Sequence, residues 1–224
     1  MLKAVIFDID GTLVDSVELH ACAWQQAMDH FARRVPIDEV RKQIGKGADQ
    51  LLPVFFSAEQ LERFGKDLEK FHGELFHREF MPQVRTFARV RELFLRIHSD
   101  GLKIALASSA TREDVNYYKR LMNVEDLVED STSADDAKKS KPHPDIFSAT
   151  LQRLNVHADE AIAVGDTPYD AIAAGKIHLR TMGILSPVWT DAQLREAGCI
   201  EVFRNPADLL ERYEESSLSE AEAA

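Results

Sequence analysis

An apolar run near the start of the chain, residues 4–7, ends in two aspartates separated by one residue, Asp8 and Asp10. Four consecutive apolar residues predict a strand that is buried on both faces. On an extended backbone, side chains two residues apart share a face, so the two carboxylates point into one small volume. Burying them together is costly unless a positive charge lies nearby. The following Gly11 lets the chain turn and lets its backbone approach a bound anion closely.

Apolar runs and helical patterns alternate along the second part of the chain. Strands are predicted at residues 102–107, 127–128, 161–164, 180–185 and 201–203. Helices are predicted at residues 85–98, after Thr111 with Asp114 three residues on, at 144–154 and after Thr167, and residues 130–141 are expected to form a polar loop. Alternating strands and helices build a parallel sheet that is covered on both faces. The predicted fold class is therefore α/β, with a Rossmann-like parallel sheet sandwiched by helices.

Residues 16–81 read as a helical block between the first strand and the rest of the chain. The helices expected there cover residues 18–31, 38–44, 48–56 and 58–80. The run Asp15-Ser16-Val17-Glu18 predicts an N-cap with a glutamate three residues on. We therefore expect an α/β core domain of residues 1–15 and 82–224, with a small all-helical domain of residues 16–81 inserted after the first strand.

The composition excludes several classes of protein. A formal net charge of -11 and the lack of a basic stripe argue against nucleic-acid binding. The sequence has no apolar run near the roughly 18 residues that a membrane span needs, and too few residues precede the first strand for a signal peptide. Cys22 and Cys199 are far apart and outside any metal-ligand pattern, so we expect both to be reduced, in a cytoplasmic protein. The acidic tail from Ser216 is expected to be frayed.

Polar residues follow several of the predicted strands directly or in the next loop. They are Asp8, Asp10, Ser108, Lys141 and Asp166. In an open parallel sheet, ligand-binding groups collect beyond the carboxyl ends of the strands, where the strand order reverses. We therefore expect these residues to converge in space although they are far apart in the sequence.

Four segments resemble, in the expected order, the motifs of the haloacid dehalogenase (HAD) superfamily. They are DIDGTLVDS from Asp8, Ser108 after the strand at 102–107, Lys141 in Lys141-Pro-His-Pro-Asp, and Gly165-Asp166-Thr-Pro-Tyr-Asp170. The resemblance covers essentially the whole chain. The helical block is similar to the C1 cap of subfamily I, as in phosphoglycolate-phosphatase-like and β-phosphoglucomutase-like proteins.

The resemblance implies a role for each matched residue. Asp8 matches the nucleophile that forms an aspartyl phosphate, and Asp10 matches the general acid and base. Ser108 and Lys141 match the residues that hold the phosphate, with Ser109 as the alternative to Ser108. Gly11 and Thr12 are also expected to lie beside the bound phosphate.

The resemblance also implies a metal cofactor, Mg²⁺. Asp8, the backbone carbonyl of Asp10, and Asp166 would hold it, because oxygen ligands suit this ion. Asp170 stands three residues after Thr167, where a carboxylate can complete a capping box. A role for Asp170 in metal binding and a role in capping the helix both remain open.

These assignments predict an Mg²⁺-dependent phosphatase that hydrolyses a small phosphorylated metabolite, with no nucleic-acid or membrane partner. The second aspartate argues against dehalogenation, because a halide leaving group needs no proton. A β-phosphoglucomutase-like phosphomutase is the main alternative, since His20 resembles a hinge histidine of such proteins and Lys46 lies in a plausible cap loop for binding substrate. A binding protein that keeps the fold without catalysis is a further alternative. His20 and Lys46 suggest a polar leaving group, a sugar or a carboxylate.

Overall fold

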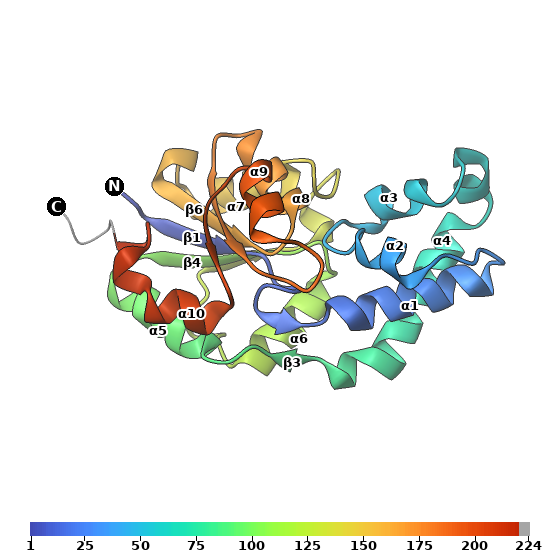
Figure 1. Ribbon diagram of the computed structural model, residues 1–224, viewed down its shortest axis with the longest axis horizontal. Coiled ribbons are helices and arrows are strands. Elements are labelled where there is room, and N and C mark those ends of the chain that lie inside the picture. Colours follow the sequence, from blue (N-terminus) through green and yellow to red (C-terminus); the bar gives the residue numbers. More distant parts are fainter. Residues whose placement is uncertain (220–224) are drawn as a thin grey trace.

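A six-stranded parallel sheet forms the centre of the protein in the computed structural model, which describes residues 1–219 (Figure 1). The strands are, in spatial order, β5 (Asp130–Thr132), β4 (Lys103–Ala107), β1 (Ala4–Phe7), β6 (Ala161–Gly165), β7 (Arg180–Ile184) and β8 (Cys199–Phe203). All neighbouring pairs are parallel. The chain runs outward from β1 in both directions, so the strand order reverses at β1. The predicted α/β fold is confirmed.

Helices cover both faces of the sheet, as Figure 1 shows above and below the strands. One face carries α5 (Val90–Ser99), α6 (Arg112–Met122) and α10 (Pro206–Glu211), and the other carries α7 (Asp145–Leu154) and α8 (Pro168–Gly175), with α9 (Asp191–Ala197) beside β7 and β8. Successive side chains of β1 point to opposite faces of the sheet, which explains why helices cover both faces. Val5 and Phe7 belong to the first apolar cluster, and Ala4 and Ile6 to the second.

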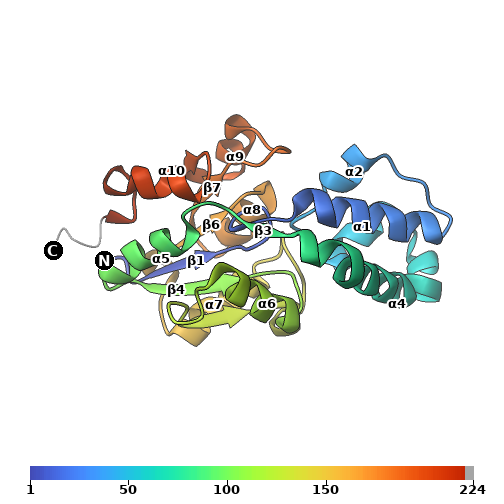
Figure 2. The same cartoon turned by 90° about the horizontal axis from the view of Figure 1, so that it is seen from below.

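The predicted helical block forms a compact group at one end of the molecule, which we call the helical lobe (Figures 1 and 2). It contains α1 (Val17–His30), α2 (Ile37–Arg41), α3 (Ala48–Leu51), α4 (Ala58–Leu75) and a π-helical turn, Phe76–Phe80. Buried apolar residues of α1 to α4 form a cluster of their own. The chain enters and leaves the lobe through β2 (Val14–Asp15) and β3 (Arg85–Thr86), which pair antiparallel. The lobe is therefore tethered to the sheet by two adjacent strands.

The prediction for the edge strand is wrong. Residues 125–127 form a turn, residue 128 has no regular secondary structure, and β5 lies in the segment that was predicted to be a loop. The apolar side chain of Leu127 is buried in the same cluster as residues of α5 and α6, without being part of a strand. An edge strand pairs on one side only, so polar residues such as Asp130 and Ser131 can form it without burying a polar side chain deeply.

Other differences lie at the ends of elements. The helix predicted at 85–98 begins only at Val90, because Arg85–Thr86 pairs with β2 as strand β3. The helices predicted at 38–44 and 48–56 end early, at Arg41 and Leu51, where turns and a short 3₁₀ segment, Leu52–Val54, replace them.

The C-terminal tail is ordered further than predicted. Ser216 and Leu218 are buried, and the Ser216 hydroxyl donates to the Tyr213 carbonyl at 2.6 Å. The expectation of fraying is therefore wrong for residues 216–219, and its remainder, residues 220–224, lies outside the described residues. Both cysteines carry free thiols. Among residues 1–219, no helix is both long and apolar enough to span a membrane.

Candidate active site

Three of the predicted site residues follow the central strands of the sheet. Asp8 follows β1, Ser108 follows β4 and Asp166 follows β6. Phe7 pairs in register with Leu106 on one side and Val164 on the other, so the three strand ends lie within one residue of one another. The backbone N–H of Asp8 donates to the Val164 carbonyl at 2.9 Å. The strand reversal at β1 thus brings the predicted residues together.

Lys141 reaches the same point from the loop that follows β5. Its side chain is fully buried, and its ammonium group forms ion pairs with Asp8 Oδ1 and, at 2.7 Å, with Asp170 Oδ1. It also donates to the Ala107 carbonyl at 3.1 Å, at the end of β4. Burial opposes the charge, but Asp170 and Asp8 raise the pKa of Lys141. Lys141 is therefore held as a cation between two carboxylates.

Asp8, Asp166 and Asp170 are all buried, and each offers a carboxylate oxygen within 4.8 Å of the others. The Thr12 hydroxyl lies 3.4 Å from both Asp8 Oδ2 and Asp166 Oδ1, so this side chain sits between two of the carboxylates. Gly11 has a φ of +83°, and a Cβ there would lie 2.3 Å from Asp166 Oδ2. Only glycine fits this turn, because a side chain would both strain the backbone and displace the carboxylate.

The three carboxylates outnumber the one ammonium group beside them, which contacts Asp8 and Asp170. Burial, opposed by Lys141, raises the pKa of Asp8 to about 7. Burial and the charges of Asp8 and Asp170 raise the pKa of Asp166 well above its ordinary value. A divalent cation would remove this excess of negative charge, and carboxylate oxygens are the ligands that Mg²⁺ prefers. The residues present therefore fit the implied metal.

Asp10 lies in a different environment from Asp8. Its Oδ1 accepts a hydrogen bond from the Ser16 hydroxyl at 2.7 Å and lies 3.1 Å from His20 Nε2. Burial opposes ionisation, but His20, Ser16 and Tyr118 outweigh it and lower the pKa of Asp10. The capping box predicted with Glu18 is wrong, because Ser16 rather than Asp15 occupies the N-cap of α1, and the Ser16 hydroxyl donates to Asp10 instead of capping the helix.

The two serines after β4 occupy different positions. Ser108 is buried, and its hydroxyl oxygen accepts from the Ala110 N–H at 3.1 Å. Ser109 lines the open cleft. The two candidates are thus separated by depth, with Ser108 next to the end of the strand and Ser109 at the cleft surface.

Asp170 completes the capping box of α8. Its Oδ2 accepts from the Thr167 N–H at 3.2 Å and from the Thr167 hydroxyl at 2.6 Å. The other oxygen, Oδ1, pairs with Lys141. Both carboxylate oxygens therefore have partners in the protein. The contact with Lys141 was not foreseen from the sequence, because the two residues lie on separate loops.

A cleft of about 440 Å³ lies between the helical lobe and the ends of the strands. Asp8 and Asp10 line it from the sheet, and His20 and Lys46 line it from the lobe. The Lys46 ammonium group donates to Gln43 Oε1 at 2.6 Å and lies 4.5 Å from the centre of the Tyr169 ring. Gly11 and Thr12 are not among the lining residues, because they face Asp166.

The lobe contacts the sheet side of the cleft through the loop that carries Lys46. A Cβ on Gly45 would lie 2.7 Å from a methyl carbon of Thr167, so glycine allows this close approach. Asp49 Oδ2 accepts a hydrogen bond from the Ser140 N–H at 3.2 Å, one residue before Lys141. The described conformation is therefore one in which lobe and sheet are in contact.

Several lining residues were not predicted as site residues. Trp24, His72 and Phe76 line the cleft from α1, α4 and the π-helical turn. In the sequence they follow helical spacing, which indicates only that they face an apolar surface. No sequence signal distinguishes a cleft-lining aromatic residue from a core residue on the same face of a helix.

Comparison with known proteins identifies the family of this chain. Residues 5–184 match the family model of haloacid dehalogenase-like hydrolases. The chain is 26% identical over 210 residues to the phosphorylated carbohydrates phosphatase of Thermotoga maritima, covering 93% of this chain and 97% of the relative. It is also 26% identical over 189 residues to pyrophosphatase PpaX of Bacillus velezensis, covering 84% of each. The crystal structure of a hydrolase from Pseudomonas syringae matches with a TM-score of 0.83 and 26% identity, covering 95% of this chain and 98% of that one. The chain belongs to the haloacid dehalogenase-like hydrolase family.

Proposed function

We propose that this protein is an Mg²⁺-dependent phosphatase that hydrolyses a small phosphorylated metabolite through an aspartyl-phosphate intermediate. The observation that carries the proposal is the position of Asp8, which lines the cleft while Lys141 pairs with its carboxylate. The names of the two relatives, both phosphatases, support this reaction class. The helical lobe would act as the cap that covers the substrate and excludes water.

In the first half of the proposed reaction, an Asp8 oxygen attacks the phosphorus and the bond from phosphorus to the ester oxygen breaks. Asp10, which must hold a proton when the substrate binds, gives that proton to the departing oxygen. In the second half, Asp10 takes a proton from water, and the water oxygen attacks the phosphorus. The bond to Asp8 then breaks, which releases inorganic phosphate and restores the carboxylate. Ser16 and His20 orient the Asp10 carboxylate for both transfers.

The phosphoryl group needs positive charge and hydrogen-bond donors around it. Lys141 supplies a buried cation, and Ser108 or Ser109 supplies a hydroxyl group beside it. Asp8, Asp166 and the Asp10 carbonyl would hold Mg²⁺. Asp170 would keep Lys141 in place, since both of its oxygens already have partners. When bound, the metal supplies a Lewis acid that offsets the charge of the phosphate oxygens.

A phosphomutase would also need to grip a second phosphate from the cap. Lys46 is the only lysine or arginine of the described helical lobe that lines the cleft, and its ammonium group is bonded to Gln43. Asp49 and Glu69 line the same part of the cleft. These two carboxylates would repel a second phosphate, and the ammonium group of Lys46 already bonds to Gln43. The arrangement therefore favours hydrolysis over binding of a bisphosphate.

The test is phosphate release from p-nitrophenyl phosphate with Mg²⁺ and with EDTA. We expect turnover only with the metal, and a covalent phosphoenzyme after acid quenching. Asp8→Asn should abolish both while the protein stays folded, because an amide is a poor nucleophile. A folded wild-type protein without turnover on this compound or on a panel of phosphate esters would reject the hydrolase and leave a binding role. Product carrying phosphate at a new position would indicate a mutase.

A further inference from the structure

The end of the cleft formed by the lobe contains a stacked pair of rings. Trp24 of α1 and His72 of α4 lie face to face, with ring centres 3.7 Å apart and planes inclined by 7°. Both residues line the cleft. Trp24 is almost fully buried, so the pair is fixed by packing rather than free to move. The faces of the two rings pack against each other where the pair borders the cleft.

His72 has a polar atom without a partner. Its Nε2 is buried and makes no hydrogen bond within the described part of the chain. Burial, together with His20 and His77, lowers the pKa of His72 well below its ordinary value, so the ring is neutral at pH 7. A neutral imidazole nitrogen can either donate or accept, depending on the tautomer, as a hydroxyl group can. A buried polar atom of this kind is costly unless a ligand satisfies it.

The charges around the ring pair are mainly negative. Glu69 lies one helical turn before His72 on α4 and lines the cleft together with Asp49. Burial and the charge of Asp49 raise the pKa of Glu69. The lysine of the lobe that lines the cleft, Lys46, is bonded to Gln43 and lies over the Tyr169 ring. A carboxylate or second phosphate would be repelled here, whereas hydroxyl groups could donate to the two carboxylates.

We propose that His72 is a specificity-determining residue that selects an uncharged, polyhydroxylated leaving group over an anionic one. The proposal rests on the proposed phosphatase function. The leaving group would lie beside the Trp24–His72 pair, and one of its hydroxyl groups would pair with His72 Nε2. Glu69 and Asp49 would accept further hydroxyl groups and exclude a terminal carboxylate.

The experiment compares two substrates that differ at one end only. Sorbitol 6-phosphate ends in a hydroxymethyl group, and 6-phosphogluconate ends in a carboxylate at the same carbon. p-Nitrophenyl phosphate serves as a substrate whose leaving group has no hydroxyl group besides the ester oxygen itself. We expect the wild-type kcat/KM to be at least about tenfold higher for sorbitol 6-phosphate than for 6-phosphogluconate, since like charges oppose the second.

His72→Phe keeps the ring stack but removes both ring nitrogens. We expect it to lower kcat/KM for sorbitol 6-phosphate by about tenfold or more, mainly through KM, and to change p-nitrophenyl phosphate less than about twofold. His72→Gln, which restores a polar group, should recover part of the loss. The matched control is His30→Phe. His30 stacks on Phe71 between the same two helices, with centres 4.2 Å apart, but does not line the cleft.

The outcomes separate the two proposals. If the wild type hydrolyses none of the three esters with Mg²⁺, the proposed function fails and the inference falls with it. The inference alone is overturned if p-nitrophenyl phosphate is hydrolysed but sorbitol 6-phosphate is not preferred over 6-phosphogluconate. It is also overturned if His72→Phe affects all substrates equally, or if His30→Phe has the same effect, because the ring would then act only in packing.

Discussion

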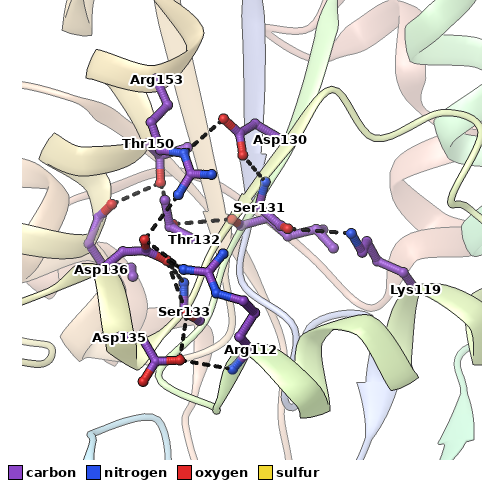
Figure 3. A network of polar contacts seen from close by, with 12 residues as sticks. Arg112, Lys119, Asp130, Ser131, Thr132, Ser133, Asp135, Asp136, Thr150 and Arg153 are labelled. Carbon is purple, nitrogen blue, oxygen red and sulfur yellow. Dashed lines mark hydrogen bonds and ion pairs between the residues drawn. The ribbon is translucent and has the colours of Figure 1, made fainter.

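Two clusters of carboxylates in this protein have opposite electrostatic character. The first, which we call the buried cluster, consists of Asp8, Asp166 and Asp170 around Lys141. The second, which we call the β5 network, joins Asp130 and Asp136 to Arg112 and Arg153 beside the edge strand (Figure 3). Both contain aspartates linked by a basic side chain. They differ in how completely the negative charge is balanced.

The β5 network is balanced. Arg153 donates to Asp130 at 2.9 Å and to Asp136 at 3.0 Å, and Arg112 donates to both oxygens of Asp136. The Ser133 N–H and hydroxyl add two further bonds to Asp136, as Figure 3 shows. Burial opposes ionisation of Asp136, but the bonds from Ser133 and Arg112 outweigh it and lower its pKa. Two carboxylates and two guanidinium groups need no further ion.

The buried cluster is not balanced. Three carboxylates share one ammonium group, and the pKa of Asp8 is raised to about 7 rather than lowered. Such an arrangement is unfavourable while all three carboxylates are ionised, and either protonation or a bound cation would relieve it. The comparison shows that the number of aspartates does not distinguish a site from a structural network. What distinguishes the candidate site from the structural network is the unbalanced negative charge at the edge of a cleft.

The largest expected effect comes from Lys141→Met. Without the ammonium group, three buried carboxylates have no counterion, so the EDTA-treated protein should lose about 3 kcal/mol or more of unfolding free energy at pH 8. Phosphatase activity should fall by about 10²-fold or more, because the phosphoryl charge loses its cation. Urea unfolding with EDTA and with Mg²⁺ measures the first effect, and phosphate release the second.

Lys138→Met is the matched control for this prediction. Lys138 lies in the same loop and lines the cleft but is exposed. We expect it to change the unfolding free energy by less than about 0.5 kcal/mol, as ordinary surface substitutions do. If Lys141→Met were no less stable than this control in EDTA, the charge imbalance of the buried cluster would be disproved.

The two clusters also predict opposite responses to pH. A group with a raised pKa, such as Asp8, contributes its full stabilisation to the metal-free protein when the pH is below the ordinary pKa of 3.8. That stabilisation is lost as the pH rises through about 7. A lowered pKa, as at Asp136, stabilises above the ordinary value and loses its contribution as pH falls below it. With EDTA, we expect Tm to fall by about 2–4 °C or more from pH 5 to pH 8.

Addition of Mg²⁺ should reduce or reverse this fall, because the metal binds the ionised carboxylates. Thermal unfolding at several pH values, with EDTA and with Mg²⁺, provides the measurement. Asp8→Asn is the informative variant, since it removes one group with a raised pKa and should flatten the EDTA curve. A Tm that rose steadily from pH 5 to pH 8 in EDTA would contradict the proposed excess of charge.

The sequence predicted the convergence of the buried cluster better than its internal contacts. Asp8, Ser108 and Asp166 each follow an apolar run, and the rules of parallel sheets bring such residues together. The ion pair from Lys141 to Asp170 could not be predicted, because both residues lie beyond strand ends, in loops whose paths depend on tertiary packing. Similarly, nothing in the spacing indicated that Ser16 would bond to Asp10 instead of capping α1.

The β5 network was missed altogether. Its strand, Asp130–Thr132, is short and polar, and strand prediction depends on apolar residues that mark burial. Arg112 and Arg153 lie on α6 and α7, which are adjacent to β5 only in the folded sheet. Exposed ion pairs between distant segments leave no local pattern. The buried cluster was easier to predict than the β5 network because Asp8 and Asp166 follow buried strands.

The smallest expected effect comes from Arg153→Met in the β5 network. Methionine keeps much of the apolar stem but removes the bonds to Asp130 and Asp136, while Arg112 still pairs with Asp136. Because partly exposed ion pairs contribute little, we expect a loss of about 0.5–1 kcal/mol of unfolding free energy, reduced further at high salt. Activity should stay within about twofold of the wild type, and stabilisation by Mg²⁺ should be unchanged. The same chain segment continues from Asp136 to Lys141, so a larger loss of activity would show that the network positions Lys141. In that case the two clusters would form one functional unit, and the distinction between them would no longer hold.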